Sequence, residues 1–153
     1  MCIRDRGKAA LNQGGPVLCD SRMVYEGVIR TQLPAENEVL CWNNCPESAV
    51  LAKKLGTTRS AAAVELWRPK LAGAVVAVGN APTALFRLLE VLEEGVDPPA
   101  VIFGLPVGFV GAAESKELLV KQCKESVQFL TLNGRRGGSA IAAAAVNALT
   151  VDG

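Results

Sequence analysis

The chain has 153 residues, a formal net charge of +1 and a composition that is 50% hydrophobic but only 5% aromatic. This length suits one domain with a substantial core, and the near-neutral charge gives no strong field that would attract nucleic acid or a membrane surface. The longest weakly polar run, residues 138–149, is too short to span a bilayer, and the first six residues lack the apolar segment of a secretory signal. We therefore expect a cytoplasmic protein without nucleic-acid or membrane partners.

The chain contains five scattered cysteines and no histidine. Cys41 and Cys45 lie four residues apart, but without a second pair or a histidine this spacing does not make a metal site, so we expect no metal and reduced thiols. The lack of histidine also bears on chemistry, because proton transfer near neutral pH most often uses this side chain. Another residue, or another chain, must take that role if the reaction needs it.

Short apolar runs alternate with amphipathic stretches along the chain. We expect residues 1–6 to be a disordered or non-native start and residues 7–153 to form a single domain. The pattern predicts the tail of a helix over 7–13, a strand over 16–19, a helix over 22–30, a strand over 39–41, helices over 47–55 and 57–67, a strand over 74–78, a helix over 82–94, a strand over 99–103, a helix over 114–123, a strand over 127–132 and a helix over 140–149.

Residues 73–86 show the repeated unit most clearly. A Val-rich run between two glycines reads as a buried strand, and a tight turn then leads through Pro82 and Thr83 into a helix with a leucine stripe. Five strands that alternate with helices, without hairpin signals, predict an α/β fold with a parallel sheet covered on both faces. The doubly wound, flavodoxin-like order is the natural choice for five strands.

The carboxyl ends of parallel strands meet at one edge of the sheet, where open α/β folds bind ligands. We call this the carboxyl edge; it would gather residues 20–22, 42–43, 79–83, 104–108 and 133–139. Glycines, helix N-termini and arginines together favour an anion, with residues 135–139 the strongest case and Arg59 with Ser60 the second. The expected ligand therefore carries carboxylates or phosphates.

Simpler interpretations stand beside this one. A single arginine at such a position can be an ordinary solvated charge, and residues 114–116 can be a helix cap followed by a surface lysine. A nucleotide- or flavin-binding module is a further alternative. The glycine spacings, however, match neither a P-loop nor the dinucleotide fingerprint.

Taken together, these segments resemble the precorrin-8X methylmutase family, whose members are also called cobalt-precorrin-8 methylmutases. The matching segments, in family order, are Cys19–Val24, Thr58–Ala63, Gly79–Leu85, Pro106–Val110 with Glu114–Lys116, and Gly134–Ser139 followed by Asn147–Leu149. The resemblance implies a flavodoxin-like homodimer with its site near the subunit interface. It also implies a step of cobalamin synthesis that needs no cofactor and no external methyl donor: the shift of a methyl group from C-11 to C-12 of precorrin-8X or cobalt-precorrin-8, giving hydrogenobyrinate or cobyrinate.

The resemblance also implies the substrate-binding residues, because that substrate bears several acetate and propionate arms. They are Arg22, Thr58, Arg59, Ser60, Gly79, Asn80, Thr83, Gly104, Lys116, Arg135, Arg136, Gly137, Gly138 and Ser139. The glycines among them are expected to keep side chains away from the macrocycle.

One feature departs from the family pattern. Members carry, before the first strand found here, a segment with a histidine that resembles a general acid, and this sequence has no histidine. Loss of such an acid typically costs about 10²–10⁴-fold in rate. We therefore expect a truncated chain with little or no activity as written. The alternative is a non-catalytic fragment that binds a corrinoid, and turnover separates the two.

Overall fold

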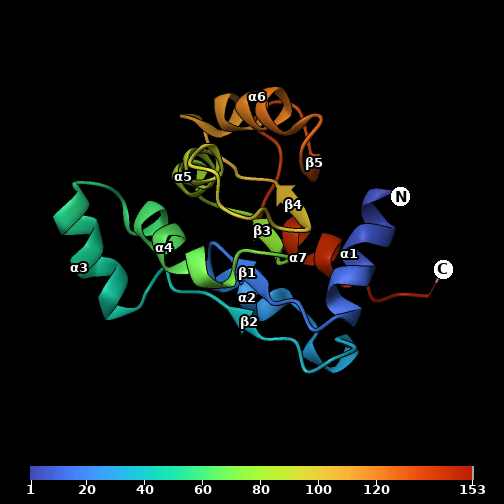
Figure 1. Ribbon diagram of the computed structural model, residues 1–153. Helices are drawn as coiled ribbons and strands as arrows, with labels where there is room; N and C mark the ends of the chain where they lie inside the picture. Colours follow the sequence, from blue (N-terminus) through green and yellow to red (C-terminus); the bar gives the residue numbers. More distant parts are fainter. Residues whose placement is uncertain (153) are drawn as a thin grey trace.

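The computed structural model describes residues 1–152, which form a five-stranded sheet with helices on both faces (Figure 1). The strands lie in the order β2-β1-β3-β4-β5, and all four neighbouring pairs are parallel. The chain thus starts in the interior of the sheet, runs to one edge and then crosses back to build the other half. This doubly wound order is the one that flavodoxin-like folds have, as the alternating pattern predicted.

The observed elements lie within a few residues of the predicted ones. The strands are β1 (Val17–Cys19), β2 (Val39–Leu40), β3 (Val75–Val78), β4 (Val101–Gly104) and β5 (Gln128–Thr131). The helices are α1 (Ile3–Asn12), α2 (Arg22–Gly27), α3 (Pro46–Leu55), α4 (Arg59–Trp67), α5 (Pro82–Glu93), α6 (Ala112–Cys123) and α7 (Ser139–Ala148), with short 3-10 turns η1 (Arg30–Gln32) and η2 (Arg68–Lys70).

Two elements differ from expectation. The predicted helix over 22–30 stops at Gly27, because Asn147 of α7 donates to Gly27 O (3.0 Å) and accepts from Ile29 N–H (2.9 Å), which holds the chain extended there. The helix α1 begins at Ile3, inside the residues 1–6 for which a disordered or non-native start was expected. The side chain of Lys8 pairs with Asp152 at 2.8 Å, so α1 is joined to the other end of the chain.

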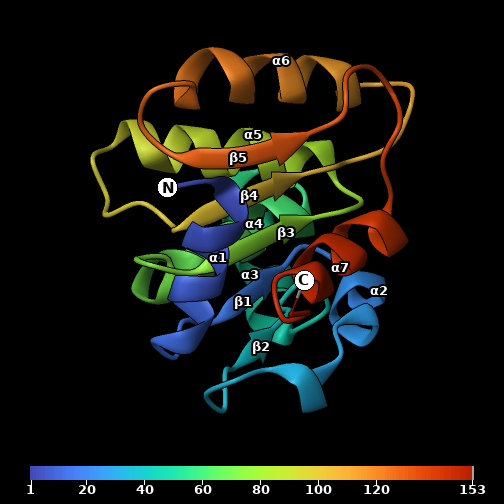
Figure 2. The same ribbon diagram turned by 90° about the vertical axis from the view of Figure 1, so that its right-hand side faces the viewer.

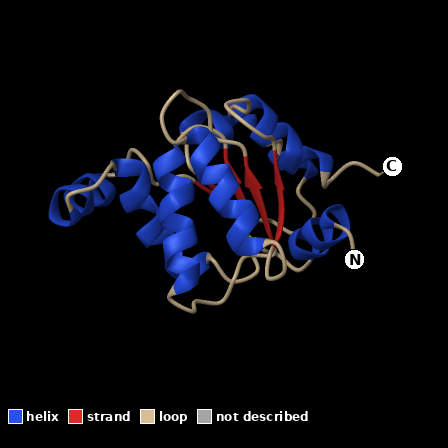
Figure 3. Ribbon diagram, turned by 90° about the horizontal axis from the view of Figure 1, so that it is seen from above, coloured by secondary structure: helices blue, strands red, loops and turns tan. Residues whose placement is uncertain are grey.

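Helices cover both faces of the sheet (Figure 3). The core accordingly has two halves, one on each face. Alternate residues of the central strands point to opposite faces: Val76 of β3 packs with α4, α5 and α6, whereas Val75 and Ala77 pack with α1, α2 and α7. All four residues of β3 and of β4 are buried. This explains the continuous apolar runs, since a parallel sheet covered on both faces has no solvent side.

The helices α4 and α5 are joined by an ion-pair network that we call the α4–α5 seam. It consists of Glu65, Arg68, Arg87, Glu90 and Glu94. Glu65, with a side chain only 16% exposed, pairs with both arginines, and Arg68 also reaches Glu94 at 2.7 Å. Every arginine of the seam is therefore matched by carboxylates.

Helix α3 packs mainly on α4 and extends outward from the body of the molecule (Figure 1). Its side chains Val50 and Leu55 are 68% and 50% exposed. Within residues 1–152, no helix combines the length and apolar character needed to cross a membrane.

Candidate functional site

The carboxyl edge brings together residues that are far apart in the sequence. In Figure 2 the arrowheads of β3, β4 and β5 point to the same side, and each helix that follows a strand starts at that side. Thr58 Oγ1 lies 2.9 Å from Thr83 Oγ1, which joins the starts of α4 and α5. Ser21 Oγ lies 3.1 Å from Ser139 Oγ, which joins the starts of α2 and α7. Four of the predicted sequence segments therefore meet at one edge.

A buried carboxylate, Asp20, supports the centre of this edge. It is 1% exposed and accepts three main-chain hydrogen bonds from the turn after β3: Gly79 N–H (2.8 Å), Asn80 N–H (3.0 Å) and Ala81 N–H (2.7 Å). Burial raises the pKa of the Asp20 carboxyl, and the three N–H donors oppose that rise. The sequence placed residues 20–22 at this edge without indicating this role for Asp20. Ser21 caps α2, accepting from Val24 N–H at 3.3 Å.

The Asp20 hydrogen bonds bear on the nucleotide alternative. In phosphate-binding α/β proteins, main-chain N–H groups at a strand-to-helix turn hold the ligand's anion. Here the three N–H groups after β3 already bind a carboxylate from the protein itself. The turn thus holds a fixed shape and offers no empty phosphate cradle, which argues against a flavin or nucleotide site at this position.

The exposed arginines of the edge are not neutralised. Within residues 1–152, no carboxylate lies within ion-pair distance of Arg59, Arg135 or Arg136. Arg135 stacks over the ring of Phe109, with 5.2 Å between guanidinium carbon and ring centroid. Arg22 differs, because it pairs with Glu26 at 2.7 Å. Three of the four predicted arginines are therefore available to an anionic ligand.

Some polar residues predicted for the site make hydrogen bonds within the protein, and others are exposed to solvent. Thr58 caps α4 by accepting from Ala61 N–H at 3.1 Å, and Ser60 donates to Asn43 Oδ1 at 3.3 Å. Asn80 and Thr83 are exposed on the turn before α5 and in its first residues. Neither Asn43 nor Phe109 was singled out as a ligand contact by the sequence, since an isolated Asn or Phe in a loop carries no pattern.

Three of the predicted glycines pack against protein atoms. A Cβ at Gly79 would lie 2.7 Å from Ser139 Cα, one at Gly104 would strike Leu119, and one at Gly137 would strike the main chain at Leu105. These glycines therefore bring the loops close to one another, whereas the resemblance suggested that they clear space for the macrocycle. A glycine is needed at position 138 for a different reason: its φ is +131°, which residues with a side chain rarely adopt.

Lys116 has a position that the sequence did not suggest. Its side chain is among the largest fully buried ones, and its ammonium donates to Gly134 O (2.9 Å) and to Arg136 O. Burial lowers the pKa of this lysine. The ammonium thus meets the loop from behind and is not displayed toward solvent, as a direct ligand contact would be.

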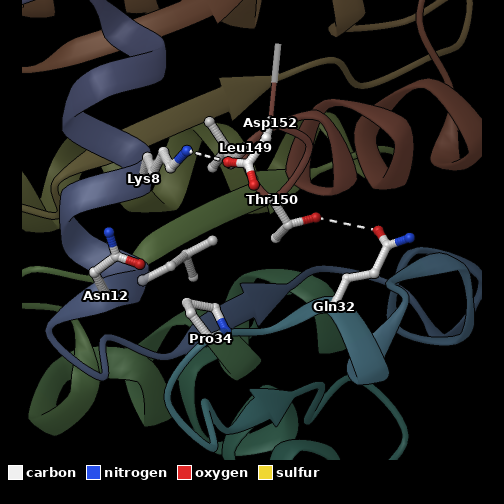
Figure 4. Close-up of a pocket in the computed structure, with 8 residues that line it drawn as sticks. Lys8, Asn12, Gln32, Pro34, Leu149, Thr150 and Asp152 are labelled. Carbon is white, nitrogen blue, oxygen red and sulfur yellow. Dashed lines mark hydrogen bonds and ion pairs between the residues drawn. The ribbon is translucent and has the colours of Figure 1, made fainter.

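A cavity of about 240 Å³ lies at the opposite, amino-terminal edge, between α1, η1 and the end of α7 (Figure 4). Its charged groups, Lys8 and Asp152, bind each other, and Thr150 donates to Gln32 at 3.1 Å. No predicted site residue lines it. Among residues 1–152 there is also no group of three His, Cys, Asp or Glu side chains placed to hold a metal ion.

Comparison with known proteins agrees with the motifs at the carboxyl edge. Residues 3–151 match the family profile described as precorrin-8X methylmutase. The chain is 58% identical over 146 residues to the precorrin-8X methylmutase of Pseudomonas aeruginosa, covering 95% of this chain and 70% of that protein. It is 38% identical to the cobalt-precorrin-8 methylmutase of Priestia megaterium, covering 95% and 64%.

Solved structures agree as well. The chain superimposes on the precorrin-8X methylmutase of Thermus thermophilus with a TM-score of 0.83 and 36% identity, covering 96% of this chain and 71% of that one. A protein described as related to precorrin-8X methylmutase gives a TM-score of 0.85 at 36% identity, covering 95% and 75%. The chain therefore belongs to the precorrin-8X methylmutase family.

Proposed function

We propose that this protein is an isomerase of cobalamin biosynthesis that moves a methyl group from C-11 to C-12 of its macrocyclic substrate. The observation that carries the proposal is the set of unpaired, exposed arginines at the carboxyl edge, Arg59, Arg135 and Arg136, in a family named for this reaction. A substrate with several carboxylate arms is complementary to such an edge.

The reaction needs chiefly positioning and charge stabilisation. The methyl group leaves one ring carbon and joins its neighbour within the same molecule, so no second substrate has to be held. Arg59 from α4 and Arg135 and Arg136 from the β5–α7 loop lie on separate elements, and each would bind a different arm of the ring. Attachment at these three points would fix the plane of the macrocycle against the turn that Asp20 holds. Asn80, Thr83 and Ser139 supply neutral hydrogen-bonding groups there.

We propose metal-free precorrin-8X as the preferred substrate. The relatives from Pseudomonas aeruginosa and a Sinorhizobium species, at 58% and 56% identity, are named precorrin-8X methylmutases. Those at 38% and 34% identity are named cobalt-precorrin-8 methylmutases. Parallel assays with both substrates test this preference, and faster conversion of the cobalt form would contradict it.

We also propose that residues 7–153, together with the first turn of α1, act as one domain in a cytoplasmic homodimer. The exposed apolar side chains of α3, Val50 and Leu55, support a partner surface on this helix. Light scattering of the purified protein measures the mass directly. A monomer at micromolar concentration would contradict the dimer.

The test of the function is a visible spectrum recorded while purified protein is mixed with precorrin-8X. The shift of the methyl group changes the conjugated system, so conversion has its own spectral signature. A saturable change that is absent with R135A/R136A supports the proposal. Binding without conversion would agree with the absence of the family's histidine and identify a non-catalytic corrinoid-binding protein. No interaction with either substrate would overturn the proposal altogether.

A further inference from the structure

Lys116 is a buried cation that does not face the solvent, so a direct contact with a ligand does not explain it. It projects from α6, is 2% exposed, and has no carboxylate within ion-pair distance among residues 1–152. A buried ammonium is costly unless hydrogen bonds compensate for its lost hydration. A leucine or methionine would fill the same volume without this cost. The charge therefore has a purpose other than packing.

The hydrogen bonds of Lys116 show where it acts. Its ammonium donates to Gly134 O at 2.9 Å and to Arg136 O, so it binds the main chain on both sides of Arg135. The two carbonyls face inward while the side chains of Arg135 and Arg136 are exposed. Drawing the carbonyls inward is thus one way in which the fold keeps both guanidinium groups on the outside.

Apart from the stacking of Arg135 on Phe109, the main chain of the loop is held at its far end. Gly138 N–H donates to Leu105 O at 2.9 Å, and Gly137 lies against the same carbonyl so closely that a Cβ would not fit. At the near end, Gly134 has a φ of +78°, a turn conformation with no bulky side chain to anchor it. Lys116 supplies two hydrogen bonds from outside the loop, one to Gly134 at this near end and one to Arg136.

We propose that Lys116 is a positioning residue that holds the main chain of residues 134–136 so that Arg135 and Arg136 are presented together to the carboxylates of the substrate. This proposal rests on the function proposed above and assigns the ammonium an indirect role. Asp20 is its counterpart: the carboxylate satisfies the main-chain donors of one loop, and Lys116 satisfies the main-chain acceptors of the other. The Lys116 ammonium also adds a third positive charge beside those of Arg135 and Arg136. An anionic ligand would reduce the repulsion among the three charges.

The first measurement is a visible-spectrum titration of the whole protein with the reaction product, hydrogenobyrinate, which requires no turnover. K116M should weaken binding by about tenfold, because the arginines lose their fixed placement. K121M, on the exposed side of the same helix, is the matched control and should bind within about twofold of wild type. K116R, which retains charged donors, should recover part of the loss. Equal binding by K116M and wild type would overturn the proposal.

A double-mutant cycle separates positioning from a general loss of structure. If Lys116 acts through the two arginines, K116M should have little effect on binding in an R135A/R136A background. An equal loss in both backgrounds would overturn the positioning role. Hydrogen exchange supplies a readout free of ligand: K116M should speed exchange in residues 132–138 and leave β3 and β4 protected. If K116M does not fold, K116Q replaces it in every arm.

The two proposals fail in different ways. If wild-type protein does not bind hydrogenobyrinate, the proposed function is wrong, and the exchange measurement still decides whether Lys116 orders the loop. If wild-type protein binds and K116M matches it in binding and in exchange, the function stands and the inference about Lys116 is wrong.

Discussion

The arginines of the α4–α5 seam and those of the carboxyl edge differ in what surrounds them. Arg68 and Arg87 each contact two or more carboxylates, whereas no carboxylate of residues 1–152 lies within ion-pair distance of Arg135 or Arg136. Matched charges in a half-buried seam stabilise the packing of two helices. Unmatched charges on exposed loops do not stabilise the fold, and their mutual repulsion falls further when an anionic ligand binds between them. Loss of an arginine should therefore reduce stability at the seam and binding at the edge.

Asp20 is expected to affect both stability and binding, because it is buried and also holds the turn at the carboxyl edge. Its substitution D20N should therefore have the largest effect. An amide NH₂ cannot accept from the N–H groups that the carboxylate now binds, so at least one buried donor loses its partner. We expect the free energy of unfolding in urea to fall by about 2–3 kcal/mol and product binding to weaken with it. D152N, which alters an exposed pair with Lys8, is the control and should change stability by less than about 1 kcal/mol. Unchanged stability in D20N would show that the turn keeps its shape without Asp20.

R135A/R136A should have the next largest effect, confined to binding. Two charge-assisted contacts to carboxylates are lost, so we expect the dissociation constant for hydrogenobyrinate to rise by about 100-fold or more. The melting temperature should stay within about 2 °C of wild type, because neither side chain is paired or buried. A large drop in melting temperature would contradict the distinction drawn between edge and seam.

R87M should show the reverse pattern. The methionine retains most of the aliphatic stem but leaves Glu65, 16% exposed, with one cation fewer. We expect a loss of about 1–2 kcal/mol in unfolding free energy and product binding within about twofold of wild type. Weakened binding by natively folded R87M would mean that the seam and the edge are coupled.

The smallest effect is a pH dependence that E65Q should remove. Burial raises the pKa of Glu65, but hydrogen bonds from Arg68 and Arg87 outweigh it and hold the pKa below its ordinary value. A lowered carboxyl pKa contributes stability that is present above the unfolded-state value and is lost as the pH falls through the folded-state value. Urea unfolding between pH 7 and pH 3 should thus show a steeper acid loss in wild type than in E65Q. Parallel curves would exclude this contribution.

Much of the fold followed from local patterns. The run before Gly79, the proline and threonine after it, and the leucine stripe of α5 each agreed with strand, turn and helix, so the element was confirmed with nearly the same bounds. Where the prediction failed, a distant residue intervened: α2 stops at Gly27 because Asn147, 120 positions later, binds the chain there. The roles of Gly104 and Gly137 were likewise decided by Leu119 and Leu105, which no local pattern connects to them.

The sequence by itself determined the family, the doubly wound order and which loops hold arginines, because hydrophobic periodicity and short motifs are properties of neighbouring residues. Only the tertiary structure decided which charges are free. Arg87 and Arg135 look alike in sequence, yet one pairs with Glu65 of another helix and the other lies over a phenylalanine ring. Lys116 looks like an ordinary helix-surface lysine, yet the loop of residues 134–136 covers it. Whether a charge binds a ligand, a partner or the protein's own main chain depends on distances across the fold, which residue order does not specify.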